Sequence, residues 1–338
     1  MKKLYFLTGI IVLFIWSCRQ QEQSKVVYFE GNALGTTYHI KAFPSKKSKN
    51  VTKKDVDSVV QAINNSLSTY QPNSLISRIN KGEVLKLDQQ FTDVFKAAKI
   101  IYRQTGGLYD PTIGILVNAW GFGPKQKIKE IAQDSSIVDS LKKFVGYNFL
   151  SIDEHGFLKK KMPQIYIDYN SIAKGYAIDR IGKMFENKGY HNYLVEMGGE
   201  VLTKGKNIKK NKPWLVAIDN PDRQHGSKFI SKIALSDQAI ATSGNYRKYY
   251  TDPQTGKKYA HTLDPKTGYP VQRHLLSASV IADNCTMADG YATAFMVMGL
   301  EAAKTFLKKH PELQAFLVYS DDKGHIKTFK TNGVPILN

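Results

Sequence analysis

The order of the predicted strands constrains the fold of this chain more than any other feature of the sequence. Five strand-like runs follow one another without a helix between them, and a sixth comes after two helices: 192–197, 213–219, 229–235, 238–244, 275–282 and 314–320. Strict alternation of strands and helices is typical of doubly wound parallel sheets, whereas consecutive strands favour antiparallel pairing. We therefore predict an α+β fold in which mostly antiparallel or mixed sheets are flanked by helices.

Helical periodicity is expected in several segments. They are 51–70, 92–104, 171–189, 286–298 and 300–309. Thr52 and Asp55 form a capping box at the start of the first, and the glycine pair at 106–107 supplies a C-cap for the second. Residues 26–43 alternate like a pair of strands joined by a turn. Because no internal repeat or long linker separates these elements, we expect one compact domain over residues 26–338.

The composition is that of a globular protein with an excess of positive charge. Of the 338 residues, 42% are hydrophobic and 23% are charged, and the formal net charge is +19. Lysine and arginine are spread through the chain, with local clusters at "KKSK" (46–49) and "KNIKKNK" (206–212). We interpret both clusters as solvated loops, in preference to a nucleic-acid surface. A cationic surface also suits acidic partners or anionic ligands.

The N-terminus has the pattern of a bacterial lipoprotein signal peptide. A basic start precedes an apolar run over residues 4–16, which is shorter than the roughly 20 residues of a membrane-spanning helix. The run ends in Ile-Trp-Ser-Cys, which resembles the lipobox. We expect residues 1–17 to be removed, Cys18 to be lipidated and residues 18–25 to form a polar tether on the periplasmic side of a bacterial membrane. The alternative is a plain signal peptide with an incidental cysteine.

Most nucleotide-binding fingerprints are missing from the sequence. "GFGPKQ" (121–126) begins like a dinucleotide-binding loop, but Pro124 follows the second glycine and no helix N-terminus is offered to a phosphate. The chain contains no P-loop, no zinc-spaced set of cysteine and histidine, and no G-x-S-x-G motif. A nucleotide would therefore have to be held in another way.

Two charged residues stand out in the predicted helices. The segment 285–298 is apolar on almost every face, yet it carries Asp289, and aspartate is rarely buried without a partner. Thr293, four residues on, places a second side-chain oxygen on the same face. Lys174 lies in the first turn of the helix 171–189, where the helix dipole disfavours a cation. An anionic ligand nearby would explain the position of Lys174, and the negative charge of a buried Asp289 must be compensated by a partner.

Ordered motifs along the chain resemble those of the ApbE family. They are "LGTTYHI", "STYQPNSLISRIN", "YDPTIGILVNAWGFG", "DYNSIAKGYAID", "MGGE", "ATSGNYRKYY", "HTLDPKTGYP" and "ADGYATAFMVMG". Members of this family are periplasmic flavin transferases that move FMN from FAD onto a threonine hydroxyl of a partner protein. The chain departs from the pattern at Asn170 and Ser171, where many members have a glycine pair, and at Leu34, where many have methionine.

The resemblance and the chemistry of the residues both point to a magnesium site. Asp289 and Thr293 present hard oxygens, which suit Mg²⁺ completed by a backbone carbonyl, water and phosphate oxygens. Such a cation would compensate the buried carboxylate. The resemblance implies that this is the metal site of the family and that the carbonyl of Ser171 is the third protein ligand. The alternative is that Asp289 acts as a cap or as the partner of Arg180 or Lys174.

The resemblance also implies a mechanism and a set of flavin contacts. Mg²⁺ would clamp the FAD pyrophosphate, the acceptor threonine would attack the FMN-side phosphorus, and AMP would leave. His261, in an H-x-x-D-P-x-T-G motif, is the expected base, because histidine titrates in the useful range; the alternative is that it only hydrogen-bonds a turn. By family position the residues that contact FAD, several through backbone atoms, are Leu34, Tyr70, Tyr109, Asp110, Asp168, Lys174 and Leu263, with Tyr70 stacked on the isoalloxazine.

Three classes of function follow from these observations. The first is Mg²⁺-dependent transfer of FMN to an acceptor flavoprotein subunit, with the membrane as a second partner and no role for nucleic acid. The second is an FAD pyrophosphatase that uses water at the same metal site and gives FMN and AMP. The residue at Tyr70 and the openness of the site would decide between this hydrolase and the transferase. The third is a flavin-binding lipoprotein without turnover. Loss of Asp289 or Thr293 would indicate that third class, and both residues are present.

Overall fold

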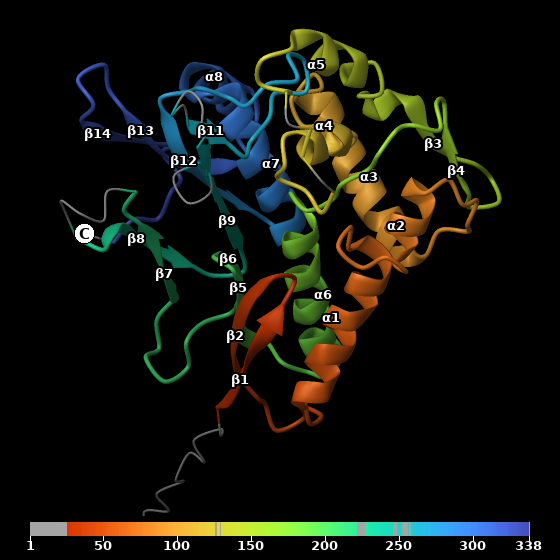
Figure 1. Ribbon diagram of the computed structural model, residues 1–338. Coiled ribbons are helices and arrows are strands. Elements are labelled where there is room, and N and C mark those ends of the chain that lie inside the picture. Colours follow the sequence, from red (N-terminus) through yellow and green to blue (C-terminus); the bar gives the residue numbers. More distant parts are fainter. Residues whose placement is uncertain are drawn as a thin grey trace, which may run out of the picture.

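The computed structural model describes residues 26–337, except for residues 126, 129, 222–226, 246–248, 252–255 and 257 (Figure 1). The predicted signal peptide (1–17), the predicted lipidation site Cys18 and the predicted tether (18–25) lie outside the described residues. Within the described part of the chain, no helix is both long and apolar enough to cross a membrane.

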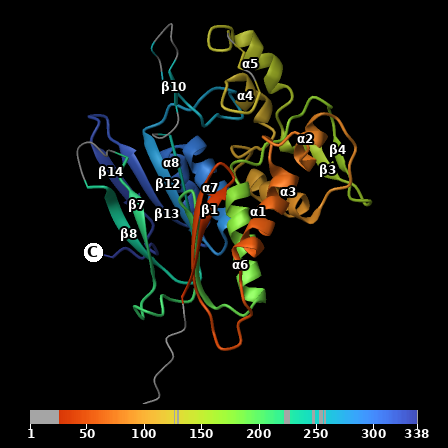
Figure 2. The ribbon, with the colours of Figure 1, turned by 60° about the horizontal axis from the view of Figure 1, so that its bottom comes forward.

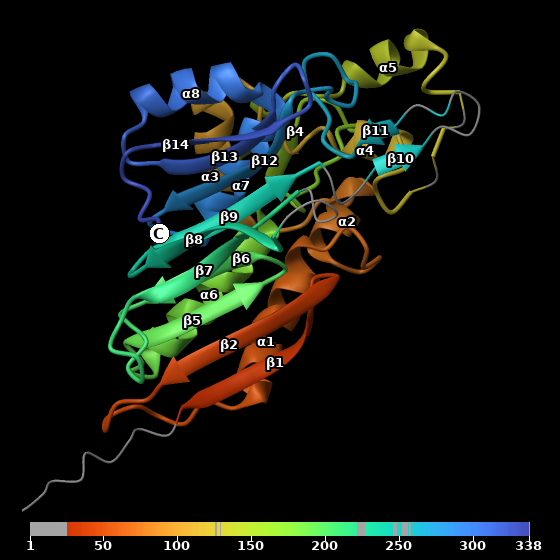
Figure 3. The same ribbon diagram turned by 90° about the vertical axis from the view of Figure 1, so that its left-hand side faces the viewer.

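An eight-stranded sheet in which every neighbouring pair is antiparallel forms the frame of the fold. Its strands, in spatial order, are β1 (Val27–Ala33), β2 (Thr36–Phe43), β5 (Asn192–Met197), β6 (Glu200–Lys204), β9 (Ala239–Gly244), β12 (Leu275–Ala282), β13 (Gln314–Ser320) and β14 (Ile326–Lys330). Figure 3 shows how this sheet twists from β1 to β14. The fold is α+β with a large antiparallel sheet, as the order of the strands predicted.

Shorter strands form two-stranded sheets beside this frame. The pairs among the described residues are β3 (Leu150–Ile152) with β4 (Leu158–Lys160), β7 (Trp214–Asp219) with β8 (Phe229–Leu235), and β10 (Tyr249–Thr251) with β11 (Lys258–Ala260). The β7–β8 pair covers one face of the large sheet, because Ile218 and Ile233 pack with Ile240 of β9 and Ile281 of β12 in a small core.

Helices cover the opposite face of the sheet (Figures 1 and 2). The helices of the described residues are α1 (Lys53–Leu67), α2 (Leu75–Asn80), α3 (Gln89–Gln104), α4 (Gly114–Ala119), α5 (Ser135–Lys142), α6 (Ala173–Asn187), α7 (Cys285–Met298) and α8 (Leu300–Lys309), with a 3₁₀ turn at Tyr147–Phe149. The inner layer is α6 and α7, which contact the strands, and α1 and α3 pack outside them. The largest hydrophobic core lies between the sheet and these helices.

Local sequence signals explain most of the helix boundaries. The Thr52 and Asp55 capping box is present at the start of α1. At the end of α3, the Gly107 N–H donates to the Tyr102 carbonyl at 2.8 Å, so the predicted glycine cap is confirmed. Helix α3 begins three residues earlier than the predicted residue 92, because the Asp88 carboxylate accepts the Phe91 N–H at 2.8 Å and caps it.

Candidate active site

The centre of the site is the contact between the N-terminal turn of α6 and the second turn of α7. Asp289 is 2% exposed, and its Oδ2 accepts the Gly175 N–H at 3.0 Å. A side chain at Gly175 would not fit, because its Cβ would lie 2.3 Å from the Cys285 carbonyl oxygen and 2.9 Å from the Asp289 Cβ. The glycine therefore lets the two helices approach closely enough for a backbone N–H to bind the buried carboxylate.

Asp179 holds the N-terminus of α7 in place. Its carboxylate accepts the N–H groups of Cys285 and Thr286, each at 2.8 Å, and the Thr286 hydroxyl. Burial raises the pKa of Asp179 to about 6, against the hydrogen bonds from α7, which lower it. Sequence reasoning assigned no role to this residue, although it ends the motif "DYNSIAKGYAID". It positions the helix that carries Asp289.

Lys174 and Glu200 form an ion pair beside Asp289. The Lys174 Nζ lies 3.2 Å from Glu200 Oε1, and Glu200 is 4% exposed. Burial lowers the pKa of Lys174, but the charges of Asp289 and Glu200 outweigh it, and the net effect is a raised pKa that keeps Lys174 cationic. The unusual lysine at the start of α6 therefore has anionic partners within the protein itself. Glu200, in the "MGGE" motif, was not predicted as a site residue.

Glu200 also keeps one oxygen without a partner. Among the described residues, no hydrogen bond reaches its buried Oε2. Burial raises the pKa of Glu200 to about 7, Lys174 lowers it and Asp289 raises it further. An unpaired buried oxygen costs free energy unless a cation, a donor or a proton meets it. The site is therefore built to receive positive charge.

The predicted metal ligands lie around this centre. Thr293 is one turn beyond Asp289 on α7, and its Oγ1 shares a hydrogen bond of 3.2 Å with the Ser243 Oγ of β9. Ser171 directly precedes α6, and its Oγ donates to the Tyr109 hydroxyl at 3.2 Å. Burial, above all, and then the nearby Asp289 raise the pKa of Tyr109 well above its usual value. The structure thus brings Ser171, Tyr109 and Asp289 to one place.

These residues fit a hard divalent cation. No group of three or more His, Cys, Asp or Glu side chains suited to a metal occurs in the described parts of the chain. A single carboxylate with a hydroxyl and a carbonyl is instead the oxygen set that Mg²⁺ uses when phosphates and water complete its shell. The Asp289 Oδ1 makes no hydrogen bond to any described residue, and this oxygen is the one left for the cation.

Two of the predicted flavin contacts, Tyr70 and Asp168, lie where the segment before α6 meets the segment after α1. Tyr70, just beyond α1, is 61% exposed, so its ring is available for stacking. Burial and the nearby charge of Asp168 raise the pKa of Tyr70. The Asp168 Oδ1 accepts the Asn170 N–H at 2.8 Å, and the Asn170 amide donates to the Thr69 hydroxyl at 3.2 Å. Tyr70 and Asp168 are therefore neighbours in the fold.

The side chain of Asp110 is bound within the protein. Its Oδ1 accepts the Thr112 N–H at 2.8 Å and the Thr112 hydroxyl at 2.6 Å, and its Oδ2 accepts the Tyr147 N–H at 3.0 Å. Burial raises the pKa of this carboxyl to about 6. Any contact between Asp110 and a flavin would therefore be through its backbone.

Leu34 and Leu263 also offer mainly their backbones. Leu34 has φ 50° in the tight turn between β1 and β2, a left-handed conformation that is uncommon for leucine. Next to this turn, the Gly198 N–H of the "MGGE" segment donates to the Thr37 carbonyl at 3.1 Å. Leu263 is buried in a core under α4 with Leu116 and forms a β-bridge with residue 270.

His261 lies on a segment that returns to the site. The neighbouring Thr262 hydroxyl donates to Asn245 Oδ1 at 2.7 Å. Asn245 follows the end of β9, two residues after the Ser243 that bonds Thr293. The structure therefore places the predicted base near the strand end that also carries a neighbour of the predicted metal ligands. His261 itself is half-buried.

A profile described as the ApbE family matches residues 34–317, which is most of the chain. The chain belongs to the ApbE family. Its predicted site residues, from Leu34 to Thr293, all fall within the matched range apart from the proposed lipidation site.

Relatives of known name support the same family. A protein of Haemophilus influenzae named FAD:protein FMN transferase is 34% identical over 340 residues, covering 96% of this chain and 96% of that protein. A protein of the same name from Vibrio cholerae is 34% identical over 309 residues, covering 89% of this chain and 90% of that protein. The chain is therefore a transferase of the ApbE family.

Solved ApbE structures share the fold. The flavin transferase ApbE from Vibrio cholerae superposes with a TM-score of 0.82 at 32% identity, covering 91% of this chain and 97% of that one. The apo form of the Pseudomonas stutzeri flavinyl transferase ApbE gives a TM-score of 0.80 at 29% identity, covering 91% and 95%. The sheet, the inner helices and the connections between them are thus features of the ApbE fold.

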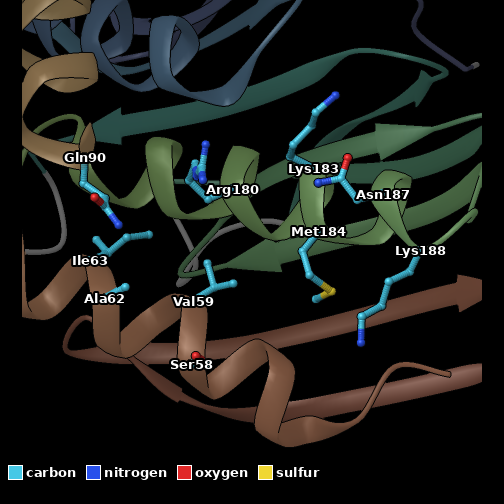
Figure 4. Close-up of a pocket in the computed structure, with 10 residues that line it drawn as sticks. All are labelled: Ser58, Val59, Ala62, Ile63, Gln90, Arg180, Lys183, Met184, Asn187 and Lys188. Carbon is cyan, nitrogen blue, oxygen red and sulfur yellow. The ribbon is translucent and has the colours of Figure 1, made fainter. Parts of the chain in front are cut away.

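A cavity of about 300 Å³ lies apart from this ApbE site, between α1 and α6 (Figure 4). Its walls come mainly from these two helices, with Gln90 of α3, and include Arg180, Lys183, Met184 and Val59. None of the predicted site residues lines it. Arg180 is also two turns along α6 from Lys174, so the cavity does not replace the site at the helix N-terminus.

Proposed function

We propose that this chain transfers FMN from FAD to a threonine hydroxyl of a partner protein in a Mg²⁺-dependent reaction that releases AMP. The observation that carries the proposal is the buried Asp289 carboxylate, which accepts one backbone N–H from the N-terminal turn of α6 and has Thr293 one turn further along α7. The names of its ApbE relatives support the substrate, and the oxygen donors support the cation.

Different residues of the chain would bind the metal ion, the phosphates and the flavin ring. Asp289, Thr293 and the Ser171 carbonyl would hold Mg²⁺, which when bound neutralises charge on the phosphates. The N-terminus of α6 and the ammonium of Lys174 attract the same phosphates, because both are positive. Tyr70 would stack on the isoalloxazine, and the turn at Leu34 would approach the flavin with its backbone.

His261 would remove the proton of the acceptor hydroxyl. The threonine oxygen forms a bond to the FMN-side phosphorus, the bond from that phosphorus to the bridging oxygen breaks, and AMP leaves with that oxygen. The proton goes to a ring nitrogen of His261, because an imidazole can accept a proton and release it again. Most of the rate would come from holding the two reactants in line and excluding water.

Intact mass and nucleotide analysis test this proposal. We would incubate the chain from Gln20 onward with FAD, Mg²⁺ and a flavoprotein fragment that a known ApbE protein labels. The fragment should gain the mass of FMN less water while AMP forms in equal amount, and His261→Ala should slow both strongly. If the chain binds FAD but no AMP forms, both catalytic activities are excluded and only the hypothesis of a flavin-binding protein remains.

A second activity is favoured by one observation. The Tyr70 ring is 61% exposed, so water can reach this side of the site. Water in place of threonine would give FMN and AMP from FAD. AMP and free FMN without a labelled fragment, in the same assay, would show that the chain is a pyrophosphatase and would contradict the transferase proposal.

We also propose that Cys18 carries a lipid that anchors the protein on the periplasmic side of a bacterial membrane. The described residues contain no helix that could span a bilayer, so the anchor would have to come from elsewhere. Cys18→Ser should leave the protein soluble or uncleaved. If this variant still partitions with membranes after its signal peptide is removed, the proposal of a lipid anchor at Cys18 is wrong.

A further inference from the structure

Two lysine-rich loops that are distant in the sequence meet at one end of the molecule. The loop between β2 and α1 carries "KKSK", and the loop between β6 and β7 carries "KNIKKNK". Both contact the connection between α6 and β5. The Lys49 N–H donates to the Lys188 carbonyl at 2.8 Å, and the Lys206 N–H donates to Asn192 Oδ1 at 3.0 Å. We call this surface the lysine end; in Figure 3 both loops lie at the left-hand end of the strands.

The lysine end carries more positive charge than its own carboxylates neutralise. Exposed lysines without an ion-pair partner among the described residues are Lys46, Lys47, Lys49, Lys209, Lys210 and Lys212. The carboxylates nearby are already paired with other lysines: Asp55 with Lys188 (2.9 Å), Asp57 with Lys53 (2.8 Å) and Asp237 with Lys204 (3.4 Å). The remaining charge is available to an anionic partner.

The β6–β7 loop also presents an apolar tip. Ile208 is 40% exposed, and the tip is closed by the Asn207 N–H, which donates to the Lys212 carbonyl at 2.9 Å. Beside the tip, a cavity of about 190 Å³ has Lys41, Lys210 and Lys212 in its wall. An apolar side chain surrounded by lysines is the pattern of a surface that lies against lipid headgroups.

The chain enters the fold at this same end. Val27 begins β1 and pairs with Ala42, close to the start of the first lysine-rich loop. Val27 follows Cys18 by nine positions in the sequence, and this length of chain reaches at most about 30 Å when extended. A lipid on Cys18 would therefore keep the lysine end near the bilayer surface.

We propose that the lysine end is a docking surface for a bilayer that contains anionic phospholipids. Its lysines would meet the headgroup phosphates, and Ile208 would enter the headgroup region. Lys174 lies at the opposite end of α6 from Lys188, and the fifteen residues of this helix span about 22 Å. Docking would therefore hold the Asp289 site away from the membrane. This orientation rests on the proposed anchor and function, whereas the lipid binding does not.

Vesicle co-sedimentation tests the proposal without the lipid anchor. The chain from Gln20 onward keeps every described element, since the fold begins at Val27. It is mixed with phosphatidylcholine vesicles with or without about 30% phosphatidylglycerol, at low and high salt. The test variant is Lys209→Gln/Lys210→Gln/Lys212→Gln. The matched control is Lys308→Gln/Lys309→Gln/Lys327→Gln, which removes the same charge from exposed positions on α8 and β14.

We expect salt-sensitive binding to the anionic vesicles alone. Each lysine near such a surface contributes about fivefold, so the test variant should bind roughly a hundredfold more weakly at low salt, and the control should bind nearly as well as the parent. Equal binding to both kinds of vesicle, no binding to either, or an equal loss in the control would overturn the proposal. Tighter binding to a short DNA duplex than to the anionic vesicles would also overturn it. Fragment labelling by the test variant should be unchanged, which separates this result from the transferase assay.

Discussion

Replacement of Lys174 by methionine is expected to destabilise the protein by about 3 kcal/mol. The Lys174 Nζ lies 3.2 Å from Glu200 Oε1, and the two side chains are 26% and 5% exposed. Asp289 adds a second negative charge. Removal of one partner from a buried ion pair leaves the other charge uncompensated and lowers the free energy of unfolding by about 3–5 kcal/mol. The lower value applies here because Lys174 keeps partial access to solvent.

Thermal unfolding measures this loss. For a chain of this size, about 3 kcal/mol corresponds to a fall of roughly 4–5 °C in Tm. The fall should be larger at about pH 8 than at about pH 6, because burial raises the pKa of Glu200 to about 7 and a protonated carboxyl needs no cation. The double variant Lys174→Met/Glu200→Gln should recover part of the lost stability. Comparison of the parent, the two single variants Lys174→Met and Glu200→Gln, and the double variant gives the coupling energy between the two side chains.

Lys183→Met is the matched control for this experiment. Lys183 lies on α6 as well, but its side chain is 61% exposed and its ion pair with Glu186 is long, at 3.5 Å. An exposed pair of this kind contributes between zero and about 1 kcal/mol. Equal losses of Tm in Lys174→Met and Lys183→Met would refute the reasoning, and so would a Lys174→Met variant that matches the parent at both pH values.

Three further substitutions test the site. Asp289→Ala should abolish AMP release more than flavin binding, because it removes the single acidic ligand proposed for Mg²⁺; full turnover of this variant with a chelator present would exclude the metal assignment. Gly175→Ala should lower both Tm and turnover, since its Cβ would lie 2.3 Å from the Cys285 carbonyl oxygen, and an unchanged Tm would show that α6 and α7 can separate freely. Asp179→Asn should change how the stability depends on pH, because burial raises the pKa of this carboxyl from 3.8 to about 6. In the parent, the protonated carboxyl therefore contributes to the free energy of unfolding fully below about pH 4, and this contribution is lost as the pH rises through 6. Parallel Tm curves for parent and variant between these pH values would contradict that shift.

The long elements of the fold could be predicted because their signals are local. The apolar stripe and capping box of α1 lie within one stretch of sequence, and so does the alternation of buried and half-buried residues in β5. Short elements gave no such signal: α2 and α4 have six residues each, fewer than two turns, so no helical period is visible. The strand β14 is mostly exposed at the edge of the sheet and has no buried run to mark it.

The site could be predicted only in part, for a related reason. Asp289 stands out because it is a lone carboxylate in an apolar helix, and the structure buries it as expected. Glu200 and Asp179 occur in ordinary polar surroundings in the sequence. Their burial comes from contacts with Lys174 and with the N-terminus of α7, and the second contact joins residues 106 and 107 positions apart. Only the folded chain shows these contacts.

The contact between Gly175 and Asp289 joins residues 114 positions apart, and this distance sets when the protein can become active. A chain that emerges from the ribosome has β2 and α6 long before it has α7. Contacts of such long range form late in folding. The carboxylate at 289 and the hydroxyl at 293 arrive together with this last inner helix. A chain that ends before residue 289 therefore has no complete site, however much of the sheet and of α6 has already formed.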